Sequence, residues 1–235
     1  MYIVRDGEIM KSKYIVLFGI VVIILIVIAC IIPQKEVKEN LLNINYNIEG
    51  NELELEYDKE NPLVAMYIEN YGSVVIELYP SIAPNTVNNF ISLIKSGFYD
   101  NNTIHRLMPG FVLQGGDPNG SGSGGPGYTI DGEFTSNGFE NNLSHKKWIV
   151  SMARTSGDFN SARSQFFICL EDSTFLDGDY ASFGEVIDGF DVIRSIEKNE
   201  MIEDPETGKL RKNLVIKKAL IDLNKYEYNE VLKNY

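Results

Sequence analysis

Side chains that hold metals or cross-link small domains are scarce in this sequence. Its 235 residues include two cysteines, two histidines and one tryptophan. Cys30 lies in a long apolar segment and Cys169 in the apolar run 166–170, so we expect no disulfide between them. His105 and His145 are 40 residues apart and have no ligand-like carboxylate spacing between them. We therefore predict no metal site and no cofactor.

Basic charge is also scarce. Lys and Arg number 21 against 33 Asp and Glu, which gives a net charge of −12. Binding to nucleic acid needs clustered Lys and Arg side chains that neutralise phosphates, and no stretch of this chain supplies such a cluster. The sequence therefore excludes nucleic acid as a partner.

Two motifs of known chemistry are missing or incomplete. The sequence has no G-x-S-x-G elbow, so a serine hydrolase is supported only by the presence of common residues. Residues 120–125 satisfy G-x-G-x-x-G, but we predict no strand before them, and Pro126 prevents a helix from starting after them. We interpret this segment as a turn-rich loop.

What the chain does have is one long apolar run near its start. The 19 residues 14–32 carry no charge, and as a helix they would span about 28 Å, close to the hydrocarbon thickness of a bilayer. Arg5, Lys11 and Lys13 precede the run, so the positive-inside rule places residues 1–13 in the cytoplasm. We predict localisation at the cell membrane, with the rest of the chain on the extracytoplasmic side.

Two fates of this run stay open. A single-pass transmembrane anchor fits its length. Alternatively, Val27-Ile28-Ala29-Cys30 resembles the lipobox of bacterial lipoproteins, in which the cysteine is acylated and becomes the new N-terminus. Translation from Met10 instead of Met1 would give such a signal a more usual length. Cys30 is thus a candidate lipidation site.

The chain changes character twice after the apolar run. Residues 33–61 are rich in Glu, Asn and Lys, and this composition favours a solvated linker, although the alternation at 52–57 is compatible with a short strand. Residues 62–224 alternate apolar runs with turn residues, as a folded domain does. Residues 225–235 form a tail whose docking the sequence leaves open.

The folded domain is predicted to contain many short strands and two helices. A Gly-Ser turn joins 66–71 to 74–79 as a β-hairpin, and helices are expected from Pro84 to Gly97 and over 190–197. The remaining predicted strands lie at 111–113, 148–152, 166–170, 181–186 and 214–221. Short strands without βα alternation indicate an antiparallel sandwich or barrel.

The most informative stretch is 98–117, FYDNNTIHRLMPGFVLQGGD. It predicts a strand carrying a His-Arg pair, a Pro-Gly turn and a second strand. Alternation would put Phe111 and Leu113 on one face of the second strand, and Val112 and Gln114 on the other. Taken alone, an arginine between apolar neighbours usually indicates a structural salt bridge.

This stretch resembles the cyclophilin signature F-H-R-x-x-P-G-F-x-x-Q-G-G-D, with Ile104 in place of the aromatic residue before His. Two further blocks are similar to family motifs in the same order: SMAR at 151–154 with SQFFI at 164–168, and FLDGDYASFG at 175–184. The resemblance extends from about residue 62 to residue 223. On these motifs the chain is identified as a bacterial cyclophilin, in a membrane-anchored or lipoprotein form.

The resemblance implies a mainly β fold, a closed eight-stranded antiparallel β-barrel capped by two α-helices, preceded by an N-terminal transmembrane or signal helix. It also implies which residues form the site. For catalysis these are Arg106, His105 and, orienting Arg106, Gln165; for substrate binding they are Phe111, Val112, Gln114, the backbone of Ala153 and Arg154, Phe167, Phe175, Leu176 and Tyr180. Phe175 stands where eukaryotic members have Trp, and Tyr180 where they have His, so weak cyclosporin binding is expected.

The implied activity is peptidyl-prolyl cis-trans isomerisation (EC 5.2.1.8), which cleaves no bond and needs neither a nucleophile nor a metal. The expected substrates are proline-containing polypeptides, above all exported proteins that are still unfolded, and the expected state is a monomer. A second hypothesis is a proline-peptide-binding module or holdase chaperone with little turnover. The client proteins and the preferred residue before proline stay open.

Overall fold

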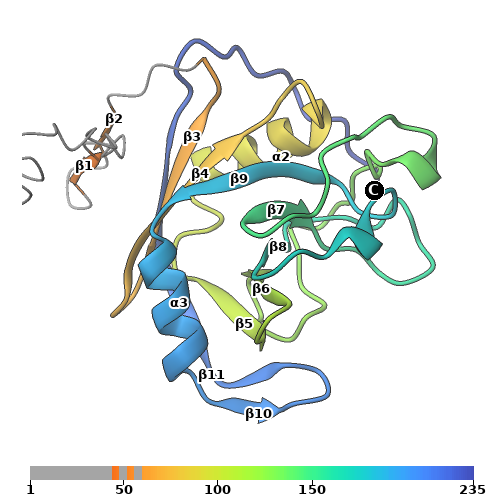
Figure 1. Ribbon diagram of the computed structural model, residues 1–235. Coiled ribbons are helices and arrows are strands. Elements are labelled where there is room, and N and C mark those ends of the chain that lie inside the picture. Colours follow the sequence, from red (N-terminus) through yellow and green to blue (C-terminus); the bar gives the residue numbers. More distant parts are fainter. Residues whose placement is uncertain (1–43, 48–51, 56–59) are drawn as a thin grey trace, which may run out of the picture. The chain divides into compact units, whose positions relative to one another are not determined.

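The computed structural model describes residues 44–47, 52–55 and 60–235 (Figure 1). The predicted membrane segment 14–32, and Cys30 within it, lie outside these residues. Within the described ranges, no helix is long and apolar enough to cross a membrane. Strands β1 (Ile44–Asn47) and β2 (Glu52–Leu55) pair antiparallel. They fall inside the segment 33–61 interpreted as a linker, and the alternation there, which was compatible with a short strand, does form one at Glu52–Leu55.

The folded domain is a closed antiparallel β-barrel. Its strands are β3 (Leu63–Ile68), β4 (Gly72–Leu78), β5 (Asn102–Met108), β6 (Val112–Asp117), β7 (Ile149–Met152), β8 (Phe166–Cys169), β9 (Ser182–Asp188) and β11 (Lys209–Asp222). Their order is β11-β3-β4-β9-β7-β8-β6-β5, and β5 pairs back with β11. The predicted eight-stranded barrel is confirmed. A short additional strand, β10 (Ile202–Asp204), extends from β11 as a hairpin that the sequence analysis missed.

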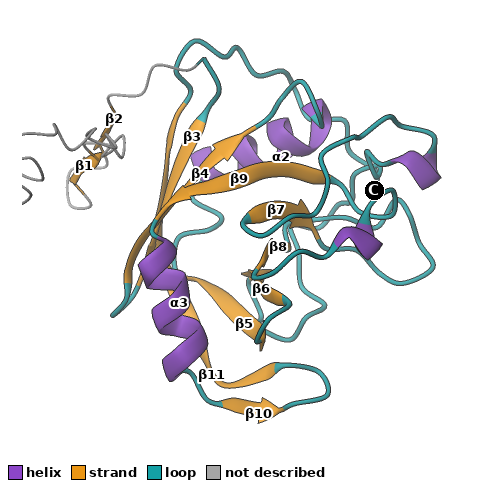
Figure 2. Ribbon diagram, in the orientation of Figure 1, coloured by secondary structure: helices purple, strands orange, loops and turns teal. Residues whose placement is uncertain are grey.

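Two α-helices accompany the barrel, as predicted: α2 (Pro84–Lys95) and α3 (Phe190–Asn199). Figure 2 shows α2 in the upper half of the domain and α3 at the lower left. The residue before α2, Ala83, has no side chain that can cap the helix. Instead, the buried Glu133 carboxylate accepts hydrogen bonds from the backbone N–H groups of Asn85 (3.0 Å) and Thr86 (2.7 Å). A distant acidic residue thus serves the helix N-terminus.

Alternate residues of the same strands pack into the barrel interior and against its outer wall. On β8, Phe166 and Ile168 join the main hydrophobic core, whereas Phe167 and Cys169 belong to a separate small cluster with Val112. This division follows from the period of two along a strand. It gives the domain a packed interior and, on the other side of β6 and β8, a second apolar surface.

The alternation predicted for Phe111 was wrong. Leu113 packs in the main core, but Phe111 contacts the outer cluster together with Val112. Phe111 precedes the first residue of β6 and follows Gly110, which has a φ of +69°. Because Phe111 still belongs to the turn, the period of two does not apply to it. The side chains of Phe111 and Val112 therefore both reach the outer apolar surface.

The C-terminal tail 225–235 docks against the domain. Asn234 and Thr129 exchange two backbone hydrogen bonds of 2.8 and 2.9 Å. The Asn85 side chain bonds both the N–H and the carbonyl of Leu232 (2.9 and 3.1 Å), and Val231 is buried. The tail therefore forms part of the described domain, a point that the sequence left open.

Candidate active site

A hollow of about 210 Å³ opens on the outer wall of the barrel, over the cluster of β6 and β8. Nine residues line it: Arg106, Phe111, Val112, Gln114, Ala153, Arg154, Phe167, Leu176 and Tyr180. All nine were predicted as site residues, although they come from four separate parts of the sequence. The three predicted residues that do not line this hollow are His105, Gln165 and Phe175.

The floor of the hollow is apolar. Val112, Phe167 and Leu176 are buried, and the half-buried Phe111 and Tyr180 pack against them. The rings of Phe167 and Tyr180 meet edge to face, with centroids 5.8 Å apart. Rigid, mostly aromatic walls around so small a volume suit one small apolar ring and exclude a larger side chain.

The guanidinium of Arg106 stands at the polar side of this hollow and is fixed by several partners. Its Nη1 donates to Oε1 of Gln114 (2.9 Å), and its Nε donates to the carbonyl of Thr207 (2.8 Å). Partial burial lowers the pKa of Arg106, and the neighbouring Tyr180 acts in the opposite direction. Because the ordinary pKa of arginine is so high, the group remains a cation at neutral pH.

Gln165 supports Arg106 through an intermediate residue. Gln114 donates from Nε2 to Oε1 of Gln165 (3.1 Å), and Gln165 donates from its own Nε2 to the carbonyl of Gly124 (3.1 Å). The hydrogen bonds thus run from Gly124 through both glutamines to Arg106. The side-chain amides of Gln114 and Gln165 are oriented consistently in this series of hydrogen bonds, since each amide oxygen accepts and each amide nitrogen donates.

The contact of Thr207 with Arg106 was not predicted from the sequence. This residue lies in the turn between β10 and β11, where the Asp204 carboxylate accepts hydrogen bonds from the Glu206 N–H (2.9 Å) and the Thr207 hydroxyl (2.8 Å). Gly208 closes the turn with a φ of +74°. Asp204-Pro205, with Gly208 three residues after the proline, is a sequence signal for such a turn. Nothing in these residues shows that the turn meets Arg106.

His105 lies beside Arg106 in the sequence but does not line the hollow. Its side chain is buried, and neither ring nitrogen has a hydrogen-bond partner within the described residues. Burial lowers the pKa of His105; Asp117 opposes this effect, and Arg106 adds to it. The ring is therefore neutral at pH 7, and its predicted part in catalysis stays a prediction.

Phe175 lies at the rim. Its side chain is 72% exposed, and its ring stacks on that of Phe111 with centroids 5.5 Å apart. It therefore extends the apolar surface beyond the hollow without contributing to its floor.

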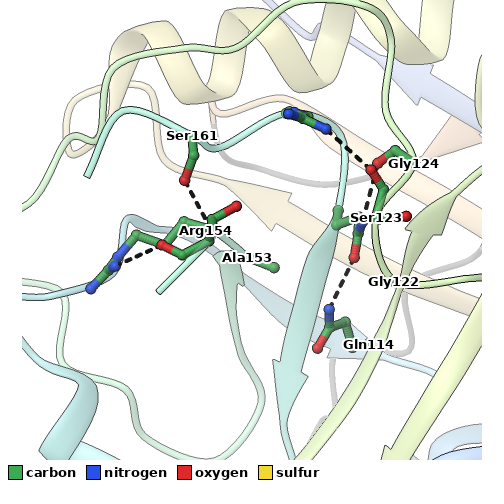
Figure 3. Close-up of a pocket in the computed structure, with 10 residues that line it drawn as sticks. Gln114, Gly122, Ser123, Gly124, Ala153, Arg154 and Ser161 are labelled. Atoms are coloured by element: carbon green, nitrogen blue, oxygen red, sulfur yellow. Dashed lines mark hydrogen bonds between the residues drawn. The ribbon is translucent and has the colours of Figure 1, made fainter. Parts of the chain in front are cut away.

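A second hollow of about 430 Å³ adjoins the first, sharing Gln114, Ala153 and Arg154 with it. Figure 3 shows it between the loop 122–124 and the segment that carries Ala153, Arg154 and Ser161. Its other lining residues are Gly122, Ser123, Gly124, Thr155, Arg163 and Gln165. The hollow is polar, since serine, threonine and glutamine side chains take the place of the rings.

The glycine-rich loop beside the second hollow is folded around one carboxylate. Asp117 accepts hydrogen bonds from the backbone N–H groups of Asn119 (2.8 Å), Ser121 (2.9 Å) and Gly122. Burial would raise the pKa of Asp117, but these backbone donors outweigh it and hold the pKa below its ordinary value. Asp117 ends β6, so the expectation that no strand precedes the glycines was wrong; no α-helix follows them before α3 in the described chain.

One buried cluster has the residue types of a serine hydrolase but not its accessibility. His145 bonds Asp177 through Nδ1 (2.8 Å) and Ser151 through Nε2 (3.0 Å). Ser151 and His145 are both fully buried, so the Ser151 hydroxyl cannot meet a substrate.

In the part of the chain that the structure describes, no group of three His, Cys, Asp or Glu residues could hold a metal ion. Burial also raises the pKa of the Cys169 thiol to about 12.

The first hollow combines a small apolar floor, which suits one small ring, with a fixed cationic donor beside it. Comparison with known proteins identifies the family. Residues 63–220 match the family model of the cyclophilin-type peptidyl-prolyl cis-trans isomerases. The chain belongs to this family and is a peptidyl-prolyl cis-trans isomerase.

Similar proteins occur in bacteria and eukaryotes. Peptidyl-prolyl cis-trans isomerase B of Bacillus subtilis is 40% identical over 137 residues, which is 58% of this chain and 92% of that protein. An isomerase of Synechococcus elongatus is 41% identical over 133 residues, 56% of this chain and 86% of that protein. A crystal structure of a Cryptosporidium parvum cyclophilin-type isomerase in the presence of the dipeptide Ala-Pro has a TM-score of 0.61 and 35% identity, covering 68% of this chain and 98% of the other.

Proposed function

We propose that this isomerase is tethered to the outer side of the cell membrane and assists the folding of exported proteins. The apolar run 14–32 and the basic residues Arg5, Lys11 and Lys13 before it support this orientation. Uncatalysed rotation about Xaa-Pro bonds takes tens to hundreds of seconds, which is slow enough to limit folding. A chain that emerges unfolded beside the membrane would meet a tethered isomerase at once.

Mass spectrometry of the mature N-terminus tests the tether. A chain that begins at Met1 or Met10 supports the transmembrane anchor, and one that begins at an acylated Cys30 supports the lipoprotein. Fatty-acid labelling that disappears in Cys30→Ser would confirm the second form. Loss of the folded domain from intact cells treated with an external protease is expected in both cases, and its protection would contradict the proposed orientation.

Catalysis rests on one observation, the charged Arg106 guanidinium held at the side of an apolar hollow. In the planar ground state the prolyl nitrogen shares its electron pair with the carbonyl, a resonance that makes the barrier about 18–20 kcal/mol. When the bond twists, this pair becomes localised on nitrogen and can accept a hydrogen bond from Arg106. The interaction exists only near the transition state, so it accelerates rotation rather than merely strengthening binding.

The other residues of the hollow bind the proline ring and position Arg106. Phe111, Val112, Phe167 and Leu176 hold the proline ring still while the preceding carbonyl swings. Gln114 fixes Arg106 through the 2.9 Å hydrogen bond. Each ~1.4 kcal/mol of differential stabilisation gives a tenfold increase in rate, so one or two charge-assisted hydrogen bonds account for a large acceleration.

A holdase that binds proline peptides with little turnover is the second candidate. The fixed geometry of Arg106 favours the enzyme, because a binding module has no need of a donor that acts only on the twisted bond. A protease-coupled assay on a short Xaa-Pro peptide, with the full-length protein in detergent, separates the two. Acceleration supports the enzyme, and binding without acceleration would leave only the holdase.

Cyclosporin binding is expected to be weak, and the protein to act as a monomer. Phe175 stands at the exposed rim and, unlike the tryptophan of eukaryotic members, has no indole N–H to donate. Phe175→Trp is therefore expected to strengthen inhibition by cyclosporin without changing turnover of a short peptide. Wild-type inhibition as strong as in Trp-bearing members would contradict this expectation.

A further inference from the structure

We propose that the Arg154 side chain is a positioning residue that acts on the substrate through Tyr180. This inference rests on the proposed use of the first hollow as the proline pocket. Arg154 borders both hollows, where a free arginine would bind peptide carbonyls or carboxylates directly. Its contacts point to a different use.

The Arg154 guanidinium lies among three aromatic rings. Its central carbon is 4.6 Å from the centroid of Tyr180, 5.0 Å from that of Phe159 and 5.5 Å from that of Phe134. All three distances fall within the range of cation–π attraction. Phe134 and Phe159 also meet edge to face at 5.3 Å. We call this arrangement the Arg154 cage.

Hydrogen bonds fix the guanidinium in the cage. Its Nε donates to the carbonyl of Asp179 (2.8 Å), the residue directly before Tyr180, and its Nη1 donates to the carbonyl of Thr155 (3.2 Å). In Figure 3 the Arg154 side chain points away from the loop 122–124, so its charged end does not face into the second hollow. What Arg154 presents to the peptide is its backbone.

Tyr180 is the member of the cage that also faces the proline pocket. Its ring packs edge to face on Phe167 at 5.8 Å and lines the first hollow. The segment before Tyr180 is also held at Asp177, which accepts hydrogen bonds from the N–H and Nδ1 of His145 (2.7 and 2.8 Å), and at the carbonyl of Gly178, which accepts from the N–H of Ser136 (2.8 Å). Arg154 therefore holds one wall of the pocket from behind, by the ring of Tyr180 and by the backbone just before it.

The consequence is a loss of pocket order, and hence of affinity, when the cation is removed. Arg154→Met keeps the length and the apolar stem but removes the charge and the donors. It is expected to raise KM roughly five- to tenfold, as the loss of one partly buried cation–π contact would, and to leave kcat within about twofold. Arg154→Lys keeps the charge but loses the Nε donor, and should restore part of the affinity.

A double-mutant cycle between Arg154 and Tyr180 tests the proposal. KM and kcat are measured for the wild type, Arg154→Met, Tyr180→Ala and the double variant, well below each variant's melting temperature. If Arg154 acts through Tyr180, Arg154→Met raises KM in the wild type but has no further effect in Tyr180→Ala. An equal effect in both backgrounds would overturn the proposal and indicate direct contact with the peptide.

Arg194→Met supplies a matched control. Arg194 also lies over an aromatic ring, that of Trp148 at 5.6 Å, but on α3, away from both hollows. Arg194→Met should leave KM unchanged. A rise in KM equal to that caused by Arg154→Met would refute a specific role for the Arg154 cage. Failure of the pocket assignment is recognised separately, because Tyr180→Ala alone would then leave KM unchanged.

Discussion

The two adjoining hollows on the barrel wall differ in the polarity of the residues that line them. The first has a volume of about 210 Å³ and is lined mainly by aromatic and aliphatic side chains; the second has about 430 Å³ and is lined mainly by glycines, serines, one threonine, glutamines and arginines. Gln114 stands between them and belongs to both. We therefore expect the first hollow to select its ligand by shape and the second to offer hydrogen bonds to a peptide backbone.

On the proposed mechanism, this difference separates catalysis from recognition of the peptide backbone. The first hollow would act on one ring and one peptide bond, and its selectivity would come from its close walls. The second depends on a loop that Asp117 holds together through backbone N–H groups, so it is shaped by main chain more than by side chains. Damage to the first should therefore reduce activity much more than damage to the second.

The largest effect is expected for Arg106→Ala. Loss of a donor that acts only on the twisted bond should lower kcat by about 10²–10³-fold, while peptide affinity changes little. Arg106→Lys, which keeps the charge without the planar fork, should recover part of the rate. Steady-state kinetics with a Xaa-Pro peptide gives both constants, and equal losses in kcat and affinity would contradict the lone-pair mechanism.

A smaller effect is expected for the floor of the first hollow. Phe167→Ala removes a buried ring and should weaken peptide binding by about 1.5–3 kcal/mol, with a smaller change in kcat. Phe175→Ala is the matched control at the exposed rim and should change the Kd of the peptide less than about twofold. Calorimetric titration with a proline peptide measures both; similar losses in the two variants would show that the rim, and not the floor, holds the ring.

The smallest effect on activity, but a clear one on stability, is expected for Asp117→Asn. An amide oxygen replaces a carboxylate that accepts several N–H groups, which should cost about 1–3 kcal/mol of unfolding free energy at pH 7. Folding lowers the pKa of Asp117, so its contribution is complete above its unfolded pKa of about 3.9 and is lost as pH falls through the folded pKa.

Urea unfolding across this acidic range measures that contribution. The difference in stability between wild type and Asp117→Asn should shrink as pH falls below 4. A difference that stays constant down to pH 2 would mean that the carboxylate charge does not hold the loop. Turnover of a short peptide at pH 7 should fall less than about threefold, because the first hollow keeps its walls.

The sequence predicted the first hollow far better than the second. Phe167 and Arg106 sit in motifs whose side chains do the work, so residue identity carries the information. The hollow beside Gly124 arises from how the loop folds back on Asp117, and the glycines were interpreted only as a turn-rich loop. Thr207 was missed for a similar reason: it supports Arg106 with a carbonyl, a group that every residue has.

Periodicity alone predicted an antiparallel sandwich or barrel, whereas the closed eight-stranded barrel was predicted only from the family resemblance. Periodicity located most strands within a few residues, whereas β11 proved to extend from Lys209 to Asp222, well before the predicted start at 214. The strand pairs with β3 over 216–222 and with β5 at Lys209 and over 214–216. Pairings between segments so distant in the sequence leave no local pattern.

The double pairing of β11 also sets an order of events during synthesis. β11 follows the other seven strands of the ring, and it alone joins β3 to β5. Until these residues have left the ribosome, the sheet has two open edges and no closed form. An enzyme that speeds the slow steps of other chains must therefore complete its own barrel late, after the other seven strands have been made.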